Sequence, residues 1–121
     1  MNDGTIFEDI QTEFSGLYPF LKIEFFRYPD QDWNTNVKTR KINPQERLIR
    51  FLKEKECENF DMGDTRTVQE LTEHFEKVFG LSVSILRKTG NVWVETILTP
   101  GWTLKQQNSE GELISLISGS H

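Results

Sequence analysis

The stretch TVQELTEHFEKVFGLSVSILRKTGNVWV, residues 67–94, decides the fold because it holds a helix, a strand and a hairpin in succession. Apolar side chains recur every three or four residues over 68–79, which is the spacing of one buried helix stripe. Gly80 predicts the end of this helix. From Leu81 apolar and polar residues alternate, so a strand with one buried face follows.

An earlier segment repeats this pattern. A helix expected over about Ile6–Tyr18 carries five apolar positions, each the same distance before a counterpart in the later helix: Phe7, Ile10, Phe14, Leu17 and Tyr18 before Val68, Leu71, Phe75, Val78 and Phe79. Thr5 with Glu8 and Thr67 with Glu70 give matching capping-box signatures. We therefore predict an internal pseudo-duplication, with repeats at about 5–62 and 67–118. The alternative is that any two helix–strand units share these features.

The remaining elements complete the expected architecture. Pro44 opens a third helix, 103–108 forms a short turn, and strands lie at 59–62 and 112–117. We predict an α+β fold: a two-layer single domain over residues 1–121. Its sheet is mainly antiparallel with four or five strands, and its helices pack on one face.

The hairpin predicts an apolar patch on the other face of the sheet. A turn centred on Thr89 and Gly90 would pair Arg87 with Val92 and Leu86 with Trp93. The expected patch consists of Phe26, Leu86, Trp93, Ile97 and Trp102, together with Trp33 from the long loop 28–42. Left open, the patch indicates a binding surface or a dimer interface; covered by that loop, it is a second small core.

Two resemblances extend this interpretation. The order of elements from about Asn59 to Ile117, with the turn Thr103-Leu104, resembles part of a β-grasp domain of the ubiquitin type that lacks its first hairpin strand. The motifs Phe79-Gly80-Leu81 and Arg87-Lys88-Thr89-Gly90-Asn91-Val92-Trp93 are similar to those of an uncharacterised family of short bacterial proteins. That resemblance implies no activity and supplies no catalytic residues.

The charge is uneven along the chain. The net charge is −5, yet the stretch 37–55 holds seven cations against two acids. Its basic stripe, which could contact phosphates, comprises Lys38, Arg40, Lys41, Arg47, Arg50 and Lys53. The alternative is a solvated face that balances an acidic body, and the acidic total disfavours nucleic acid at long range.

The sequence offers little catalytic chemistry. It has no Gly-rich phosphate loop and no GxSxG elbow, and its single cysteine, Cys57, excludes a disulfide framework. Cys57 and His74 lack an orienting third group, and His74 lies on the expected outward side of its helix. The run from Asp30 resembles a calcium loop but has Lys41 where a glutamate is needed. We expect no cofactor and no metal.

These observations favour a small non-enzymatic interaction module, with an enzyme the least favoured class. It would bind another protein or itself through the outer sheet face or an edge strand. The alternative function is nucleic-acid binding through the stretch 37–55, which the net negative charge of the chain disfavours. No segment predicts a membrane span or a secretion signal, so we expect a cytoplasmic protein.

Overall fold

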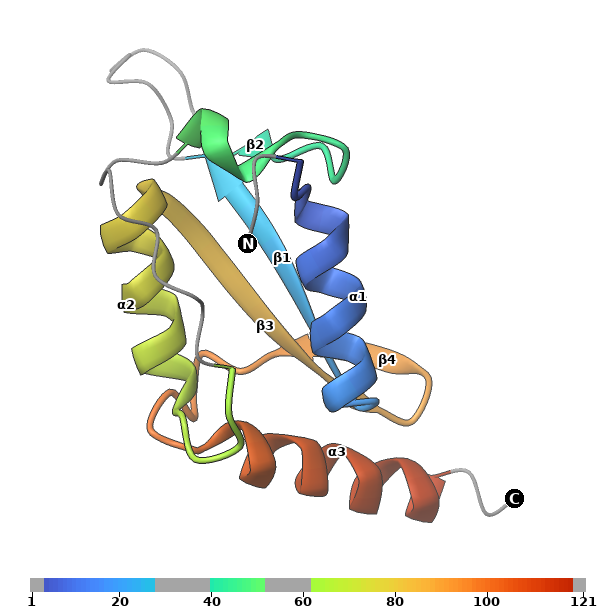
Figure 1. Cartoon of the computed structure of the whole chain (residues 1–121). Coiled ribbons are helices and arrows are strands. Elements are labelled where there is room, and N and C mark those ends of the chain that lie inside the picture. Colours follow the sequence, from blue (N-terminus) through green and yellow to red (C-terminus); the bar gives the residue numbers. More distant parts are fainter. Residues whose placement is uncertain (1–3, 28–39, 52–61, 119–121) are drawn as a thin grey trace, which may run out of the picture.

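The computed structural model of this 121-residue chain describes residues 4–27, 40–51 and 62–118 (Figure 1). In chain order the elements are α1 (Phe7–Leu17), β1 (Leu21–Arg27), β2 (Arg40–Lys41), a 3-10 helix (Leu48–Phe51), α2 (Val68–Phe79), β3 (Leu81–Thr89), β4 (Val92–Glu95) and α3 (Leu104–Ser118). All neighbouring strands are antiparallel, and their order in the sheet is β2-β1-β3-β4. β2 contributes only two residues, so β1, β3 and β4 make most of the sheet. The chain forms one small α+β domain, as predicted.

The register of β1 and β3 is symmetric about one residue pair. Glu24 lies opposite Ser84 at the centre of the ladder, while Leu21 pairs with Arg87 and Arg27 pairs with Leu81. Each helix runs directly into its strand, and α1 and α2 lie on the same face of the sheet (Figure 1). The two helix–strand units therefore meet through β1 and β3.

The core lies between this sheet face and the helices. Alternate strand residues, such as Ile23 on β1 and Ile85 on β3, point into it and are almost fully buried. The Phe25 ring lies 4.9 Å from Phe7 of α1 and 5.2 Å from Phe75 of α2, measured between ring centroids. Phe25 thus links both helices to the sheet.

The two helix starts differ. Thr67 caps α2 as expected: its hydroxyl accepts the Glu70 N–H at 3.1 Å, and the Glu70 carboxylate accepts the Thr67 N–H at 3.1 Å. α1 begins one residue later than its Thr5–Glu8 signature predicts. Ile6 is the N-cap, and the carboxylate of Asp9 accepts its N–H at 2.9 Å. Because isoleucine has no side-chain acceptor, its backbone carbonyl accepts the Asp9 N–H instead, at 3.1 Å.

The predicted strand at 112–117 is wrong, because these residues belong to α3. The region 103–108, expected as a short turn, holds the helix start. Thr103 and Gln106 form a reciprocal cap: the Thr103 hydroxyl accepts the Gln106 N–H at 3.1 Å, and the Gln106 amide oxygen accepts the Thr103 N–H at 2.9 Å. The final strand expected from the β-grasp resemblance is therefore helical.

α3 packs across one end of the sheet (Figure 1). Gln107 is fully buried there, accepting from the Arg87 guanidinium at 3.0 Å and donating to the Thr99 carbonyl at 2.9 Å. A side chain on Gly111 would lie 3.0 Å from carbon atoms of both Phe20 and Arg87. A glycine at this point therefore lets the helix approach the sheet closely.

The third predicted helix is shortened to the 3-10 turn at Leu48–Phe51. The carbonyls of Pro44 and Glu46 accept the Glu8 and Phe7 N–H groups at 2.9 and 3.1 Å, so they cap α1 and do not build a helix of their own. The predicted strand at 59–62 lies outside the described residues except for Met62, which is buried and not in a strand.

The hairpin turn lies one residue further along the chain than predicted. Thr89 pairs with Val92 and Lys88 with Trp93, so Gly90 and Asn91 form the loop. Gly90 has a φ of 69°, which glycine supplies without steric cost at the first position of a type II′ turn. The pairing shifts by two residues, so each side chain keeps its predicted face.

Candidate functional site

The face of the sheet opposite α1 and α2, here called the outer face, carries a mixed set of side chains. Its members are Lys22, Glu24, Phe26, Ser82, Ser84, Leu86, Lys88, Trp93 and Glu95. Trp93 lies opposite Lys88, and Leu86 is its diagonal neighbour on β3. The Lys22 ammonium lies 5.1 Å from the Trp93 ring centroid, a cation–π distance. Leu86 and Trp93 therefore form a small apolar centre beside cations.

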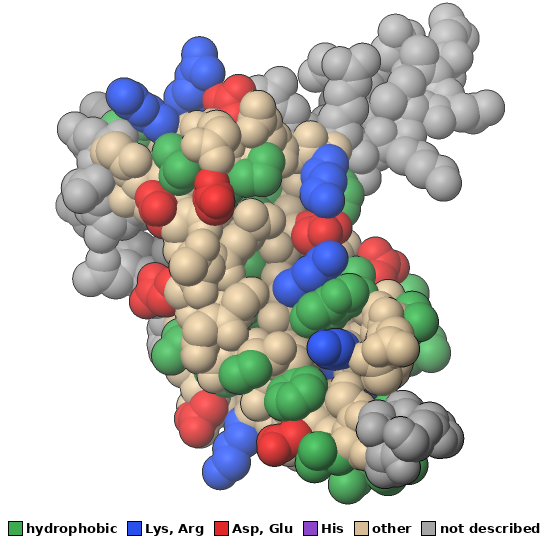
Figure 2. Space-filling view, turned by 90° about the vertical axis from the view of Figure 1, so that its right-hand side faces the viewer, with side chains coloured by type: hydrophobic (Ala, Val, Ile, Leu, Met, Phe, Trp, Pro, Cys, Tyr) green, Lys and Arg blue, Asp and Glu red, His purple; other side chains and the backbone are tan. Residues whose placement is uncertain are grey.

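Charged and polar contacts occupy the middle of the outer face. The Glu24 carboxylate pairs with the Lys41 ammonium at 3.1 Å and the Lys22 ammonium at 3.5 Å. Phe26 lies beyond this carboxylate, four strand positions from Lys22 and so roughly 13 Å along β1. The view in Figure 2 likewise shows hydrophobic side chains interspersed with charged ones. The outer face therefore mixes apolar and charged side chains, and its Leu86–Trp93 centre lies at one end.

The structure separates the six residues of the predicted patch. It brings together Leu86 and Trp93, with Phe26 on the same face but distant. Trp102 lies at the end of the sheet near α3, where the Arg87 guanidinium carbon is 5.7 Å from its ring centroid. Trp33 lies outside the described residues.

Ile97 leaves the outer face because β4 ends early. The N–H and hydroxyl of Thr96 both donate to the Ile85 carbonyl, at 3.1 and 2.8 Å. This double contact turns the chain away after Glu95, the last residue of β4. Ile97 consequently lies in the loop that follows and is 72% exposed.

A groove that the sequence did not predict lies between α2 and β3 and is called the α2–β3 groove. Its volume is about 330 Å³, and its apolar lining comprises Val68, Val83, Ile85, Ile97 and Pro100. Gln69, Thr72, Glu73, Ser84, Glu95 and Thr96 supply polar groups. The groove exists because β4 is short. The sequence signal for this is weak and consists of Pro100 and Gly101, which favour a loop after the strand.

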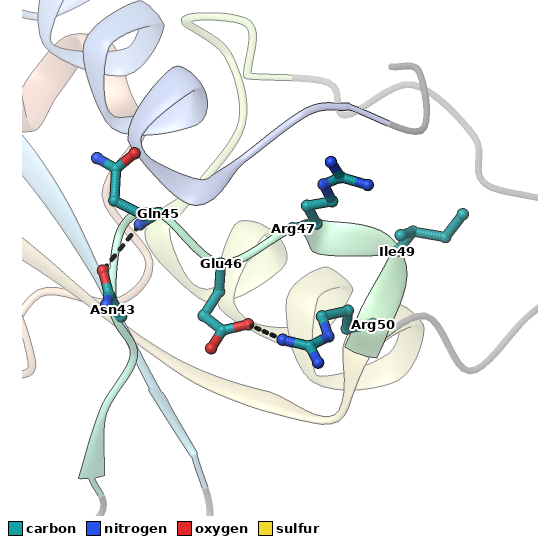
Figure 3. A pocket seen from close by; sticks show the side chains of 6 residues that line it. All are labelled: Asn43, Gln45, Glu46, Arg47, Ile49 and Arg50. Carbon is teal, nitrogen blue, oxygen red and sulfur yellow. Dashed lines mark hydrogen bonds and ion pairs between the residues drawn. The ribbon is translucent and has the colours of Figure 1, made fainter.

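The basic stripe is described in part. Lys41 on β2 and Arg47 and Arg50 in the turn after it are exposed, while Lys38, Lys53 and the Arg40 side chain lie outside the described residues. The Arg50 guanidinium pairs with Glu46 at 2.9 Å. Arg47 points away from this pair and makes no ion pair within the described part of the chain (Figure 3).

These arginines border a shallow open pocket. It has a volume of about 530 Å³ and is lined by Asn43, Gln45, Glu46, Arg47, Ile49 and Arg50. The Asn43 side-chain oxygen accepts the Gln45 N–H at 3.0 Å, which holds the turn in shape. Two cations beside one carboxylate leave a single net positive charge along this rim.

The carboxyl group of Glu70 has a lowered pKa. Hydrogen bonds from the Thr67 backbone and side chain, and from Arg66, hold the pKa of Glu70 below its ordinary value of 4.5. This effect belongs to the helix cap and not to a cleft. Among described residues, no cluster of three or more His, Cys, Asp or Glu side chains could hold a metal ion. Cys57 of the hypothetical Cys57–His74 pair lies outside the described residues, and His74 is half-buried against Phe75.

No known protein family, curated protein or solved structure matches this chain. The resemblances to the β-grasp fold and to the bacterial family therefore stay predictions. In the described part of the chain, no helix has the length and apolar character needed to cross a membrane.

Proposed function

We propose that this protein is a small non-enzymatic interaction module that binds a protein surface, either a partner's or that of a second copy, through its outer face. The observation that carries this proposal is the Leu86–Trp93 centre, which no described helix covers and which lies between Lys22 and Lys88. Tryptophan anchors ringed by polar groups are typical of the residues that dominate protein–protein binding energy.

The charges suggest the kind of surface that would fit. Lys22 and Lys88 flank the apolar centre, whereas Glu24 is already neutralised by Lys22 and Lys41. A complementary surface would place an apolar side chain on Trp93 and a carboxylate near Lys88.

Light scattering over a concentration series tests the proposal, with Trp93→Glu as the variant. We expect the variant to lose association while circular dichroism shows the fold retained, because a buried carboxylate would oppose the contact. Val92→Glu is the matched control, since Val92 is adjacent in β4, faces the other way and is 59% exposed. Association unchanged in Trp93→Glu would contradict the proposal, and a strict wild-type monomer would exclude its homodimer form.

We also infer that the two helix–strand units are an internal pseudo-duplication. The register supports this, because the β1–β3 ladder pairs the first residue of one strand motif with the last of the other, Leu21 with Arg87 and Arg27 with Leu81. Two equivalent units related by a twofold axis near Glu24 and Ser84 would give this pairing.

The alternative function is nucleic-acid binding through the basic stripe, and Arg47 is the observation that favours it. Its guanidinium is exposed, carries no ion pair to a described residue and borders an open pocket. Oligonucleotide binding that weakens steeply with salt and fails in Arg47→Ala/Arg50→Ala would support this function. Absence of binding at low salt would remove it.

A further inference from the structure

Among the described residues, no strand pairs with the outer edge of β3 before Ile85, whose carbonyl accepts from Thr96. β4 pairs with β3 only from Leu86 to Thr89. The Lys88 N–H bonds the Phe20 carbonyl, so even-numbered residues of β3 turn toward β1 and odd-numbered ones turn away. Val83 therefore points its N–H and C=O outward, and within the described residues neither group has a hydrogen-bond partner.

On the corresponding edge of β1, a side chain bonds one backbone carbonyl. Ile23 is the counterpart of Val83, and its carbonyl accepts a hydrogen bond from the Gln11 amide of α1 at 3.0 Å. The α2 residue at the position of Gln11 is Thr72, whose hydroxyl donates to the Val68 carbonyl within its own helix at 2.8 Å. Among the described residues, the Val83 carbonyl therefore lacks the side-chain contact that Gln11 makes with Ile23.

The open edge faces the α2–β3 groove. Val83, Ser84 and Ile85 form one side of this groove, and the first two turns of α2 form the other. Its volume of about 330 Å³ lies at the low end of the range for ligand pockets. Unpaired backbone groups beside an apolar groove are the elements of strand addition, in which the backbone gives affinity and the groove reads alternate side chains.

Two carboxylates give the groove its charge. Glu73 accepts a hydrogen bond from Gln69 at 3.0 Å, and Glu95 accepts one from Ser84 at 3.2 Å. Neither is paired with a cation among the described residues. A ligand of opposite charge would be favoured at this rim.

We propose that the β3 edge and the α2–β3 groove bind an extended, basic peptide segment of a partner protein. The peptide adds antiparallel to β3, continuing the line of β4, and exchanges hydrogen bonds with the N–H and C=O of Val83. An apolar side chain enters the groove against Val68 and Ile97, and a Lys or Arg faces Glu73 and Glu95. This inference rests on the proposed role as an interaction module but assigns a second surface, which adjoins the outer face at Ser84 and Glu95 and does not include the Leu86–Trp93 centre.

A second copy is the weaker occupant. Pairing β3 with the β3 of another molecule would bring Glu73 and Glu95 close to their own equivalents, and like charges facing each other oppose association. The proposal therefore commits to a basic segment that this edge does not itself supply.

The test uses peptides selected from a displayed random nonapeptide library, then synthesised with blocked ends and measured by calorimetry against the full chain. Thr72→Gln is the decisive variant, because its amide would reach the Val83 carbonyl as Gln11 reaches that of Ile23. We expect peptide affinity to fall about tenfold or more, since hydrogen bonds at the edge are lost. Gln11→Ala, on the equivalent β1 edge, is the matched control and should leave affinity unchanged.

Two further measurements separate this site from its alternatives. Methylating the peptide nitrogen that faces Val83 should weaken binding as strongly as Thr72→Gln, and Glu73→Lys should weaken it more than the control Glu76→Lys, which lies outside the groove. Failure to enrich any peptide, full affinity in Thr72→Gln, or a dimer that Thr72→Gln dissolves would each overturn the proposal. Because Trp93→Glu should leave peptide affinity intact, failure here is distinguishable from failure of the outer-face function.

Discussion

The α1–β1 and α2–β3 units bury matching stripes of side chains, except that Leu17 is exposed where Val78 is buried, and they differ at their outer edges. Phe14 and Phe75 occupy matching positions in the two apolar patterns, and both are fully buried. Gln11 bonds the Ile23 carbonyl of β1, whereas Thr72 bonds within α2 and no described side chain bonds the Val83 carbonyl of β3. Packing thus follows the apolar pattern, while one polar position in each helix differs in whether it bonds a strand carbonyl or its own helix.

The helix ends differ in a related way. α2 begins with the Thr67–Glu70 box and ends at Gly80, which has a φ of 66°. α1 begins at Ile6 and depends on the carbonyls of Pro44 and Glu46 for its first amides. The first amides of α2 likewise bond distant carbonyls, since Val68 and Gln69 donate to Trp102 and Pro100. The two helices therefore differ only in the side-chain cap and the terminal glycine, which α2 has and α1 lacks.

The largest expected effect comes from emptying the equivalent core positions. Phe14→Ala and Phe75→Ala should each lower the unfolding free energy by about 3–5 kcal/mol, because each creates a cavity in a fully buried site. Phe75 should lose more, since its ring also meets Phe25 and Phe79. Urea denaturation measures both, with the leucine variants as substitutes if an alanine variant does not fold. A much smaller loss at Phe14 would break the equivalence of the units.

An intermediate effect of opposite sign is expected at two glycines. Gly80→Ala should cost about 1–2 kcal/mol, because its positive φ disfavours a side chain. Gly16→Ala in α1 should instead stabilise by about 0.5–1 kcal/mol, since its Cβ would meet no atom within 4 Å and alanine favours the helix. Thermal unfolding of the pair checks this contrast. If both substitutions changed the unfolding free energy in the same direction, the helix ends would not be as described.

The smallest effect concerns acidity at the α2 cap. The pKa of Glu70 is lowered in the folded protein, so its contribution is present at neutral pH and is lost as the pH falls below 4.5 and through the folded value. Glu70→Gln keeps a cap like that of Thr103 and Gln106 but cannot titrate. Unfolding free energies at neutral and acid pH should therefore differ less in Glu70→Gln than in wild type. An identical pH dependence in both proteins would contradict this assignment.

Sequence patterns predicted the two helix–strand units well because their signals are local and repeated. The α2 cap, the alternation in β1 and β3 and the side-chain faces of the hairpin all follow from short-range periodicity. α3 was mispredicted although Thr103 and Gln106 carry a cap signature. Its buried face holds Gln107 and Gly111, polar or small residues that a search for apolar stripes overlooks.

The positions of the candidate sites depend on tertiary contacts, which the spacing of apolar residues in the sequence does not reveal. Placing Ile97 on the outer face required β4 to continue, and the Thr96 contact to Ile85 that ends it is tertiary. The open edge at Val83 depends on a strand being absent and on Thr72 bonding within its own helix. Neither fact can be read from residue order, since both concern which partner a polar group finds in space.

The symmetric ladder between β1 and β3 also bears on how the chain folds. It joins residues as far apart in sequence as Leu21 and Arg87, whereas each helix and the β3–β4 hairpin needs only near neighbours. Such distant pairing requires a long loop to close, and the entropy cost of closure comes before the contacts can stabilise the chain. This slows folding. We expect the helices and hairpin to form first and the search for the Glu24–Ser84 register to set the overall rate.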